Sequence, residues 1–488
     1  MTTLLIANRG EIALRVIRTA AELGLDTVAV YADDDADSPH VRAATRAVPL
    51  AGGYLDQGEL LSVAAAEGAD LLHPGYGFLS ESAEFAAACA DAGITFVGPS
   101  PEVLSQLGDK SAARAMARAA GLPVPAATEG ASDLAMIRAF AAGQEGGIMI
   151  KALAGGGGRG MRVVLPGADV AEGYRECAAE ALQGFGDDAL FAEALVTDAR
   201  HIEVQIVGAG AVVALGDRDC SVQRRHQKLI EIAPAQDLPP VLRRELHAAA
   251  ATLGAAVGYR GIGTVEFLVA GDSFTFLEVN PRIQVEHTIT EEVTGVDLVG
   301  TQLAIALGAE LDGLGLPAGV TARPGAPAEG QPATAHGIAI QARVNMETMG
   351  ADGSALPTVG TLTTFSPPTG PGVRVDTFGV LGLRTSARYD SLLAKVVSHV
   401  RTPSFSAAVR KAQAALGEFA IDGVATNIGF LQSILAETEF QSGPVHTSYV
   451  AVKMPILDTT PPPVAVGAEM RLNDGENLIL APLTGVVV

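Results

Sequence analysis

The sequence has 488 residues, 48% of them hydrophobic, and a formal net charge of −22 at pH 7. A chain of this length exceeds what one hydrophobic core organises, so we expect about two to four domains. The negative charge argues against a nucleic-acid-binding surface, and no apolar run approaches the roughly 18 residues of a membrane span. The chain also lacks a signal-peptide pattern and a cysteine pairing pattern, and these features predict a cytoplasmic protein.

The first region, residues 1–108, has the β-α-β order of a doubly wound parallel sheet. Apolar residues 4–7 predict a strand that leads into an amphipathic helix at 12–23. The single glycine between them argues against a dinucleotide-binding loop. The glycine-rich loop 73–78 follows an apolar pair, so we expect it at the carboxyl end of a strand, where such sheets bind ligands. A plain tight turn is the alternative, and Ser80 is expected to cap the next helix.

The second region, residues 109–320, contains a strand that ends at Lys151 and then a run of four glycines at 155–158. Glycines bring backbone N–H groups close to phosphates and allow a lid to move; a flexible linker is the alternative. Residues 199–206 alternate like a half-buried strand. Residues 217–228 form the one dense basic cluster of this acidic chain. This cluster suggests an anion pocket, with a solvated loop as the alternative.

A predicted β-hairpin within residues 264–288 carries the most specific polar pattern. Its second strand ends in Glu278, Asn280 and Arg282, which share one face because side chains two apart on a strand point the same way. An odd-length loop or a bulge would bring Glu266 of the first strand onto that face, and we predict this arrangement. Two carboxylates and an amide oxygen form a site suited to Mg²⁺. A solvated hairpin edge is the alternative.

The third region, residues 335–450, has a mixed α and β pattern. A strand at 337–345 carries Arg343, and a helix is predicted at 406–418. Residues 451–488 read as a linker followed by the apolar start of a further domain, so we expect the chain to be truncated there.

Six motifs follow one another along the chain: Ala7-Asn8-Arg9-Gly10-Glu11-Ile12-Ala13, His73-Pro74-Gly75-Tyr76-Gly77-Phe78-Leu79-Ser80, Gly155 to Met161, Gln223-Arg224-Arg225-His226-Gln227-Lys228, Glu278-Val279-Asn280-Pro281-Arg282-Ile283-Gln284-Val285-Glu286-His287-Thr288 and Arg388-Tyr389-Asp390-Ser391-Leu392-Leu393. In this order they resemble biotin carboxylase, an ATP-grasp enzyme of the biotin-dependent carboxylases. The resemblance implies an N-terminal Rossmann-like domain, a central ATP-grasp domain with a glycine-rich lid, and a C-terminal mixed α+β domain. The final residues resemble the first strand of a biotinyl domain.

The resemblance also implies a role for each matching residue. ATP would be bound by Lys110, Lys151, Gly155, Gly156, Gly157, Gly158, Met161, Glu193, Val196, His201, Gln223 and His226. Mg²⁺ (or Mn²⁺) would be held by Glu266, Glu278 and Asn280, and bicarbonate by Lys228, Arg282, Gln284, Val285 and Glu286. Tyr76 and Arg343 would lie near the ureido ring of biotin. The catalytic residues would be Glu286, Arg343, Lys228 and Arg282.

The implied activity is ATP- and bicarbonate-dependent carboxylation of biotin on a carrier domain, the first half-reaction of an acyl-CoA carboxylase. Glu286, as general base, would deprotonate bicarbonate, which then attacks the γ-phosphate of ATP to give carboxyphosphate. Arg343 would stabilise the enolate-like ureido oxygen of biotin. The implied partners are a biotinyl carrier domain, a carboxyltransferase domain or subunit and, in a homo-oligomer, further copies of the chain.

Three alternatives stay open at this point. The chain could belong to a pyruvate carboxylase, or it could be a nucleotide-binding docking subunit with little activity. A different ATP-grasp ligase would leave Glu286 and Arg343 without a role. One departure from the family pattern is Ala194, where relatives often have a lysine beside the adenine-facing glutamate. We expect weaker ATP binding, or a compensating cation elsewhere.

Overall fold

The computed structural model describes residues 2–153, 160–350 and 352–458. The predicted glycine lid at 155–158 and the predicted start of a biotinyl domain within 459–488 lie outside the described residues. Among the residues described, no helix combines the length and apolar character needed to cross a membrane.

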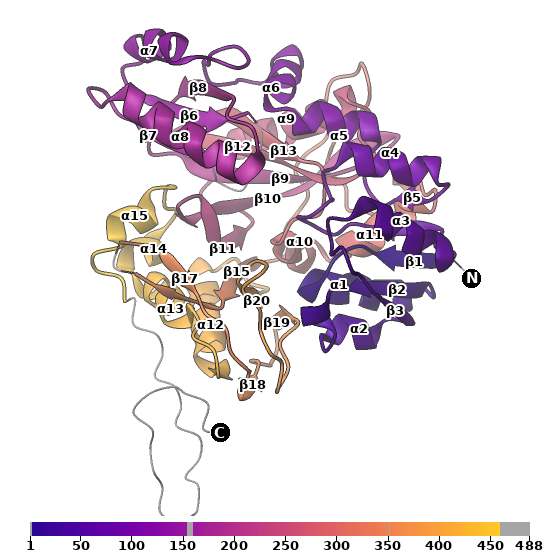
Figure 1. Cartoon of the computed structure of the whole chain (residues 1–488). Coiled ribbons are helices and arrows are strands. Elements are labelled where there is room, and N and C mark those ends of the chain that lie inside the picture. The colour runs from indigo at the N-terminus through magenta and orange to yellow at the C-terminus, as the bar shows by residue number, and fades with distance from the viewer. Residues whose placement is uncertain (1, 154–159, 351, 459–488) are drawn as a thin grey trace, which may run out of the picture.

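The N-terminal region forms a five-stranded parallel sheet with the strand order β3-β2-β1-β4-β5. This confirms the predicted doubly wound sheet, which stands on the right of Figure 1. Its strands pair in parallel because each is followed by a helix that returns the chain across the sheet. The elements are β1 (Thr3–Ile6), α1 (Gly10–Glu22), β2 (Asp26–Tyr31), α2 (Pro39–Ala43), β3 (Arg46–Pro49), α3 (Gln57–Ala66), β4 (Leu71–His73), α4 (Ala83–Asp91), β5 (Thr95–Phe96) and α5 (Pro101–Gly108).

The predicted cap of α4 was wrong by two residues. Ser82, not Ser80, is the N-cap, and its hydroxyl accepts a hydrogen bond from the Phe85 backbone N–H. Ser80 instead belongs to the preceding turn, where its N–H bonds to the Gly77 carbonyl. The glycine-rich loop therefore takes two more residues than predicted before the helix begins.

The loop after β4 is held by His73 and Asn8. The N–H of Gly75 donates to Nδ1 of His73 at 3.0 Å, and Nε2 of His73 lies 3.2 Å from Oε1 of Gln302. Gly75 has a φ of +64°, and a Cβ there would lie 2.7 Å from the Asn8 amide nitrogen, so only glycine fits. Since one ring nitrogen of His73 accepts a hydrogen bond, the ring is neutral in this arrangement.

The stability of the chain should fall as the pH drops from 6.5 towards 4. Burial lowers the pKa of His73 from its usual 6.5 to about 4. The unfolded chain therefore takes up a proton first, and the contribution of His73 is complete above pH 6.5 and lost as the pH falls through 4, at a cost of about 3 kcal/mol. Melting temperatures measured at pH 7 and 5 should converge in His73→Gln. The exposed His336 provides the control, because His336→Gln should keep the pH dependence of the parent.

A small lobe consists of the three-stranded sheet β7-β6-β8 and its helices, at the top of Figure 1. Lys151 lies near the end of its central strand, as predicted from the sequence. The elements of this lobe are α7 (Leu134–Ala142), β6 (Ile148–Ala152), β7 (Met161–Val164), α8 (Val170–Phe185) and β8 (Leu190–Ala194). Helix α6 (Lys110–Ala119) precedes the lobe and packs against α5 and β13 (Ser273–Asn280).

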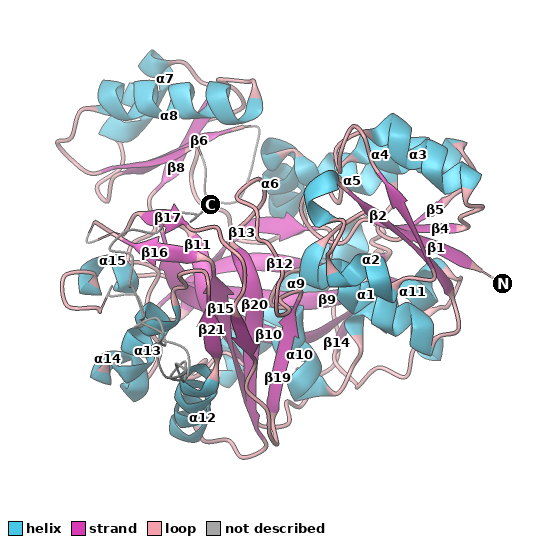
Figure 2. Ribbon diagram, turned by 60° about the horizontal axis from the view of Figure 1, so that its bottom comes forward, coloured by secondary structure: helices cyan, strands magenta, loops and turns pink. Residues whose placement is uncertain are grey.

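A nine-stranded sheet forms the centre of the molecule, with the order β13-β12-β9-β10-β11-β15-β20-β19 and β14 paired to β10. It continues from the second predicted region into the third, so the two regions share one hydrogen-bonded sheet (Figure 2). Its strands are β9 (Arg200–Ala209), β10 (Ala211–Arg224), β11 (Gln227–Ala233), β12 (Gly261–Ala270), β13 (Ser273–Asn280), β14 (Val320–Ala322), β15 (Ile338–Asn345), β19 (Val373–Thr377) and β20 (Leu392–Val400).

The remaining elements cover this sheet and complete a mixed α and β region, as predicted. Helix α9 packs its apolar side against β9, β10 and β12, and α12 covers β15 and β20. The covering and C-terminal elements are α9 (Pro240–Ala256), α10 (His287–Thr294), α11 (Leu298–Ala306), β16 (Glu347–Met349), β17 (Ala355–Pro357), β18 (Thr364–Ser366), α12 (Phe405–Glu418), β21 (Ala420–Asp422), α13 (Ile428–Ala436), α14 (Thr438–Ser442) and α15 (Tyr449–Lys453).

The structure confirms the predicted shared face of Glu266 and Glu278 in the β12–β13 hairpin, and a bulge rather than an odd-length loop produces it. Ala270 pairs with Ser273 across a two-residue turn, and the register then shifts between Phe267 and Glu266. The shift absorbs one extra residue, Leu277, so that Glu266 pairs with Glu278. Residues that pair directly across a sheet share a face, and the two carboxylates therefore lie together.

One other sequence interpretation needs correction. Strand β9 was predicted to be half-buried, yet nearly all of it is buried. Its alternation is real: Ile202, Val204 and Ile206 face the α9 core, whereas Glu203 and Gln205 face a polar interior at 0% and 1% exposure. For the basic cluster the alternative of a solvated loop does not hold, because β10 and β11 contain most of it and only residues 225–227 at the turn between them are exposed.

Candidate active site

The ammonium group of Lys228, at the start of β11, contacts three buried carboxylates. It lies 2.6 Å from Glu203 of β9, 2.9 Å from Glu266 of β12 and 2.7 Å from Glu286, the residue before α10. Neighbouring strands of one sheet and the loop after β13 bring these groups together. The sequence predicted Lys228, Glu266 and Glu286 as site residues but missed Glu203.

Arg343 of β15 contacts the second carboxylate oxygen of Glu286. Its Nη2 donates to Oε2 of Glu286 at 2.9 Å, and its Nε donates to Glu231 of β11. Glu231 is fully buried and also accepts a hydrogen bond from the Gln341 side chain at 3.0 Å. Glu231 therefore orients the guanidinium that the sequence assigned to the ureido ring.

The pKa of Glu286 reflects this surrounding charge. Burial would raise the pKa of the carboxyl group, but Lys228 and Arg343 outweigh burial and hold it well below the usual range. Burial would lower the pKa of Lys228, but the carboxylates of Glu203, Glu266 and Glu286 outweigh burial and hold it well above its usual value. Glu286 is thus ionised, yet it is a weak base while both cations are bound to it.

Glu278 and Asn280 extend the cluster at the end of β13. Burial raises the pKa of Glu278, and the neighbouring Glu266 carboxylate raises it further. The Asn280 amide donates to Glu266 at 2.9 Å, and Arg282 donates to its oxygen at 3.0 Å. Two adjacent carboxylates that repel each other, Glu266 buried and Glu278 half-buried, fit a divalent cation. A flip of the Asn280 amide would turn its oxygen towards these carboxylates.

The residues assigned to the nucleotide lie along the β6–β8 sheet and the facing strands. Nζ of Lys110 donates to the Ala152 carbonyl at 3.0 Å, and Lys151 pairs with Glu193 of β8. Arg114 also donates to Glu193, at 2.6 Å, and so supplies a cation one residue from Ala194. Met161 begins β7, and Val196 is half-buried just beyond β8.

His201 joins the nucleotide residues to the carboxylate cluster. Its Nε2 lies 2.8 Å from Glu266, and its Nδ1 lies 2.6 Å from the Gln223 amide nitrogen. His226 occupies the turn between β10 and β11 with a φ of +64°. The Gln284 side chain donates to Glu266 at 2.9 Å, so the segment after β13 folds back onto the predicted metal ligands.

Arg218 of β10 is the main residue that the sequence interpretation missed. Its guanidinium is fully buried and has all five N–H groups bonded. The acceptors are Glu203, Gln205, Thr290, Thr264 and Gln284. The alternation of polar residues in β9 could have indicated it, because a buried Glu203 needs a cation on the neighbouring strand.

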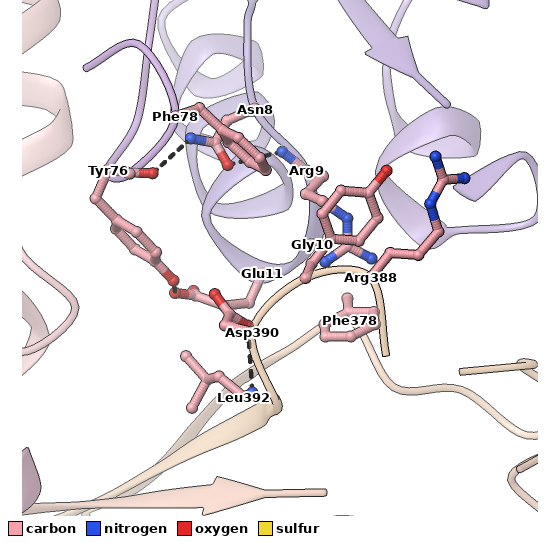
Figure 3. Close-up of a pocket in the computed structure, with 12 residues that line it drawn as sticks. Asn8, Arg9, Gly10, Glu11, Tyr76, Phe78, Phe378, Arg388, Asp390 and Leu392 are labelled. Carbon is pink, nitrogen blue, oxygen red and sulfur yellow. Dashed lines mark hydrogen bonds between the residues drawn. The ribbon is translucent and has the colours of Figure 1, made fainter. Parts of the chain in front are cut away.

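Tyr76 lines a cavity of about 220 Å³ between the N-terminal sheet and the loop before β20. Its hydroxyl donates to Glu11 of α1, and Asp390 lies close by (Figure 3). Arg9 borders the same cavity, pairs with Asp35 and stacks on the ring of Tyr389 at 4.1 Å. The cavity thus combines aromatic walls with the buried carboxylate of Glu11 and the carboxylate of Asp390.

Models of three protein families match successive parts of the chain. They are the biotin carboxylase N-terminal domain at residues 1–104, the carbamoyl-phosphate synthase L chain ATP binding domain at 109–314 and the biotin carboxylase C-terminal domain at 341–452. The biotin carboxylase domain of 2-oxoglutarate carboxylase from Hydrogenobacter thermophilus is 34% identical, with a TM-score of 0.86 over 94% of this chain and 99% of that one. The chain belongs to the biotin carboxylase family.

The structure of that biotin carboxylase domain is a dimer in complex with MgADP, ADP and bicarbonate. Biotin carboxylases are ATP-dependent ligases with an ATP-grasp centre, as the sequence predicted. Two longer proteins share the biotin carboxylase region. A single-chain, multi-domain long-chain acyl-CoA carboxylase is 57% identical, with a TM-score of 0.84 over 93% of this chain and 43% of that one. Mitochondrial pyruvate carboxylase of Mus musculus is 44% identical over 457 residues, and this chain spans 37% of its length.

Proposed function

We propose that this chain carboxylates biotin on a carrier domain at the expense of ATP and bicarbonate, as the first half-reaction of an acyl-CoA carboxylase. The observation that carries the proposal is the contact of Glu286 with both Lys228 and Arg343, beside the adjacent Glu266 and Glu278. This arrangement supports the proposal, because one cluster would supply a base, two cations for an anionic substrate and a set of oxygen ligands.

Bicarbonate would replace Glu286 as the partner of Lys228 and Arg343. The pKa of Glu286 then rises, because the two cations that lower it are engaged by the substrate. Glu286 takes the proton of bicarbonate, and the resulting oxygen attacks the γ-phosphate of ATP. The γ-phosphoryl group moves to bicarbonate and ADP leaves, which gives carboxyphosphate.

Arg343 would act in the second step. Carboxyphosphate releases CO₂ and phosphate, the phosphate takes the N1′ proton of biotin, and N1′ forms its bond to CO₂. The negative charge that develops on the ureido oxygen requires a fixed cation, and Glu231 holds Arg343 in place for this task. Tyr76 borders the cavity through which the ring would enter.

The nucleotide would lie between the β6–β8 sheet and the carboxylate cluster. Glu266, Glu278 and Asn280 would hold Mg²⁺, which would supply charge neutralisation for the transferring phosphoryl group. Lys110 and Lys151 would bind phosphate oxygens, so Lys151 would exchange Glu193 for the nucleotide. Arg282 would turn from Glu81, its partner at 2.6 Å, towards bicarbonate.

The higher identity to the acyl-CoA carboxylase, 57% against 44% for the pyruvate carboxylase, supports an acyl-CoA as the final acceptor. A biotinyl carrier domain and a carboxyltransferase, on this chain or on a partner, follow from that assignment. We also propose a cytoplasmic homo-oligomer. The proposed domains are residues 1–108, 109–320 and 335–450, followed by a linker and the start of a biotinyl domain at 451–488.

Bicarbonate-dependent ATP hydrolysis by the purified chain, stimulated by free biotin, tests this function. A folded chain that binds ATP but shows no such hydrolysis would instead be a nucleotide-binding docking subunit. Addition of a biotinylated carrier with an acyl-CoA-specific or a pyruvate-specific carboxyltransferase then distinguishes the two acceptors, because only the matched pair yields carboxylated product.

Replacement of Glu278 tests the metal assignment. Glu278→Gln keeps the shape of the side chain but removes one ligand charge, so the Mg²⁺ concentration for half-maximal ATP turnover should rise by about tenfold or more. The measurement is ATP hydrolysis as a function of free Mg²⁺. Glu176→Gln, an exposed glutamate paired with Arg162, should leave the Mg²⁺ dependence unchanged. An unaltered Mg²⁺ dependence in Glu278→Gln would remove Glu278 from the ligand set.

A further inference from the structure

Lys395, in the middle of β20, has a fully buried ammonium group that lies behind the proposed active site. Nζ donates to the backbone carbonyl of Val285 at 3.1 Å and pairs with Glu11 at 2.9 Å. Asp376 of β19 lies farther away, at 3.8 Å. Since Val285 directly precedes Glu286, Lys395 fixes the backbone that carries the proposed base.

Glu11, in the first turn of α1, connects the same ammonium group to the cavity wall. Its Oε1 accepts the Tyr76 hydroxyl as well as the Lys395 ammonium. Its Oε2 is buried and has no hydrogen-bond partner among the described residues. Figure 3 shows the Tyr76 hydroxyl and the Glu11 carboxylate meeting at the edge of the cavity.

A buried ion pair of this kind needs a reason other than stability. Two apolar side chains of similar volume are often as stable as a buried pair, because the desolvation of both charges offsets their attraction. An unbonded buried carboxylate oxygen adds a further cost. The pair also lies where three parts of the chain meet: α1 of the N-terminal sheet, the segment after β13, and β20 of the C-terminal region.

We propose that Glu11 and Lys395 act as one positioning unit that holds Tyr76 and the Val285–Glu286 backbone in a fixed relation. This inference rests on the proposed function, since it concerns the relation between the base and the biotin ring. Neither residue touches the reacting atoms. Their effect would be on the geometry of bicarbonate deprotonation and of the ring, and a displacement of about 1 Å is enough to cost about 100-fold in rate.

Kinetics of ATP hydrolysis with bicarbonate and free biotin test the unit. Lys395→Met should lower the biotin-stimulated kcat by about 100-fold, while the KM for ATP stays near that of the parent. Glu11→Gln should lower the same kcat by about tenfold or more. Asp217→Asn provides the control, because Asp217 is an equally buried, ion-paired carboxylate that faces α9. It should lower the melting temperature without a change in kcat.

The double variant Glu11→Gln/Lys395→Met distinguishes a unit from two separate residues. If the pair acts together, the double variant loses no more than Lys395→Met alone; independent residues would multiply their losses. If Lys395→Met does not fold, Glu11→Gln carries the test, because it keeps the side-chain shape. A folded Lys395→Met or Glu11→Gln with the parent kcat, or multiplied losses, would overturn the inference. Absence of biotin-stimulated hydrolysis in the parent chain would overturn the proposed function instead.

Discussion

Glu286→Gln should lower bicarbonate-dependent ATP cleavage and biotin carboxylation by about 10²- to 10⁴-fold, the usual contribution of a general base. The amide has nearly the shape of the carboxyl group but cannot accept the proton of bicarbonate. Lys228 and Arg343 lose a shared anionic partner, yet Lys228 keeps Glu203 and Glu266, and Arg343 keeps Glu231. The variant should therefore fold and bind nucleotide.

Two measurements on the same preparation separate chemistry from binding in this variant. Isothermal titration with MgADP should give a dissociation constant close to that of the parent, while turnover is lost. Glu67→Gln, which removes a carboxylate from a surface pair with Arg46, should retain full activity. Turnover by Glu286→Gln at a rate near that of the parent would show that another group removes the proton.

Arg218→Met should cause the largest loss of stability of any single substitution in the site. The side chain is fully buried, and its removal leaves Glu203 with Lys228 as its only ion-pair partner among the described residues. Loss of one partner from a buried pair costs about 3–5 kcal/mol, and here Lys228 alone would compensate a carboxylate that two cations now share. The variant also frees Gln284, which Arg218 holds at 2.9 Å, so activity should fall together with the melting temperature.

The surface residue Arg162 provides the comparison for Arg218. It also makes two ion pairs, with Glu176 and Glu180, but its side chain is 37% exposed. Exposed pairs contribute about 0–1 kcal/mol, so Arg162→Met should change the melting temperature little. Equal shifts in the two variants would contradict the view that burial makes Arg218 important. Arg218→Met/Glu203→Gln should recover part of the loss, since the carboxylate that Arg218 no longer compensates is then absent.

The strand pattern was the part of this site most open to prediction from sequence. Alternation placed Glu278 and Asn280 on one face, and the expectation that Glu266 joins them required an odd-length loop or a bulge. The structure contains the bulge, at Leu277. The same alternation in β9 was read correctly, but its polar face was assigned to water. Periodicity reports which residues share a face, whereas the neighbours of that face come from strands distant in sequence.

The site residues that the sequence did not predict share a different property. Their partners lie far away in the sequence, so no local pattern links the two. Arg218 looks like an ordinary charged position in the basic cluster, and Glu231 like one just beyond it. Only burial against Glu203 and Arg343 gives them a role. The N-cap at Ser82 was missed for a smaller reason. Two serines precede α4, and the length of the turn before the helix determines which of them is the N-cap.

The sequence by itself determined the order of the elements, the family and the side chains available to the site, because motif spacing, turn residues and periodicity are local properties of the chain. Only the tertiary structure decided which charges share a partner. Lys228 meets Glu286 across 58 positions, and Lys395 meets Glu11 from the opposite end of the chain. The physical reason is desolvation, because a buried charge is costly unless an opposite charge lies next to it. Tertiary packing, not distance along the sequence, determines which opposite charge that is.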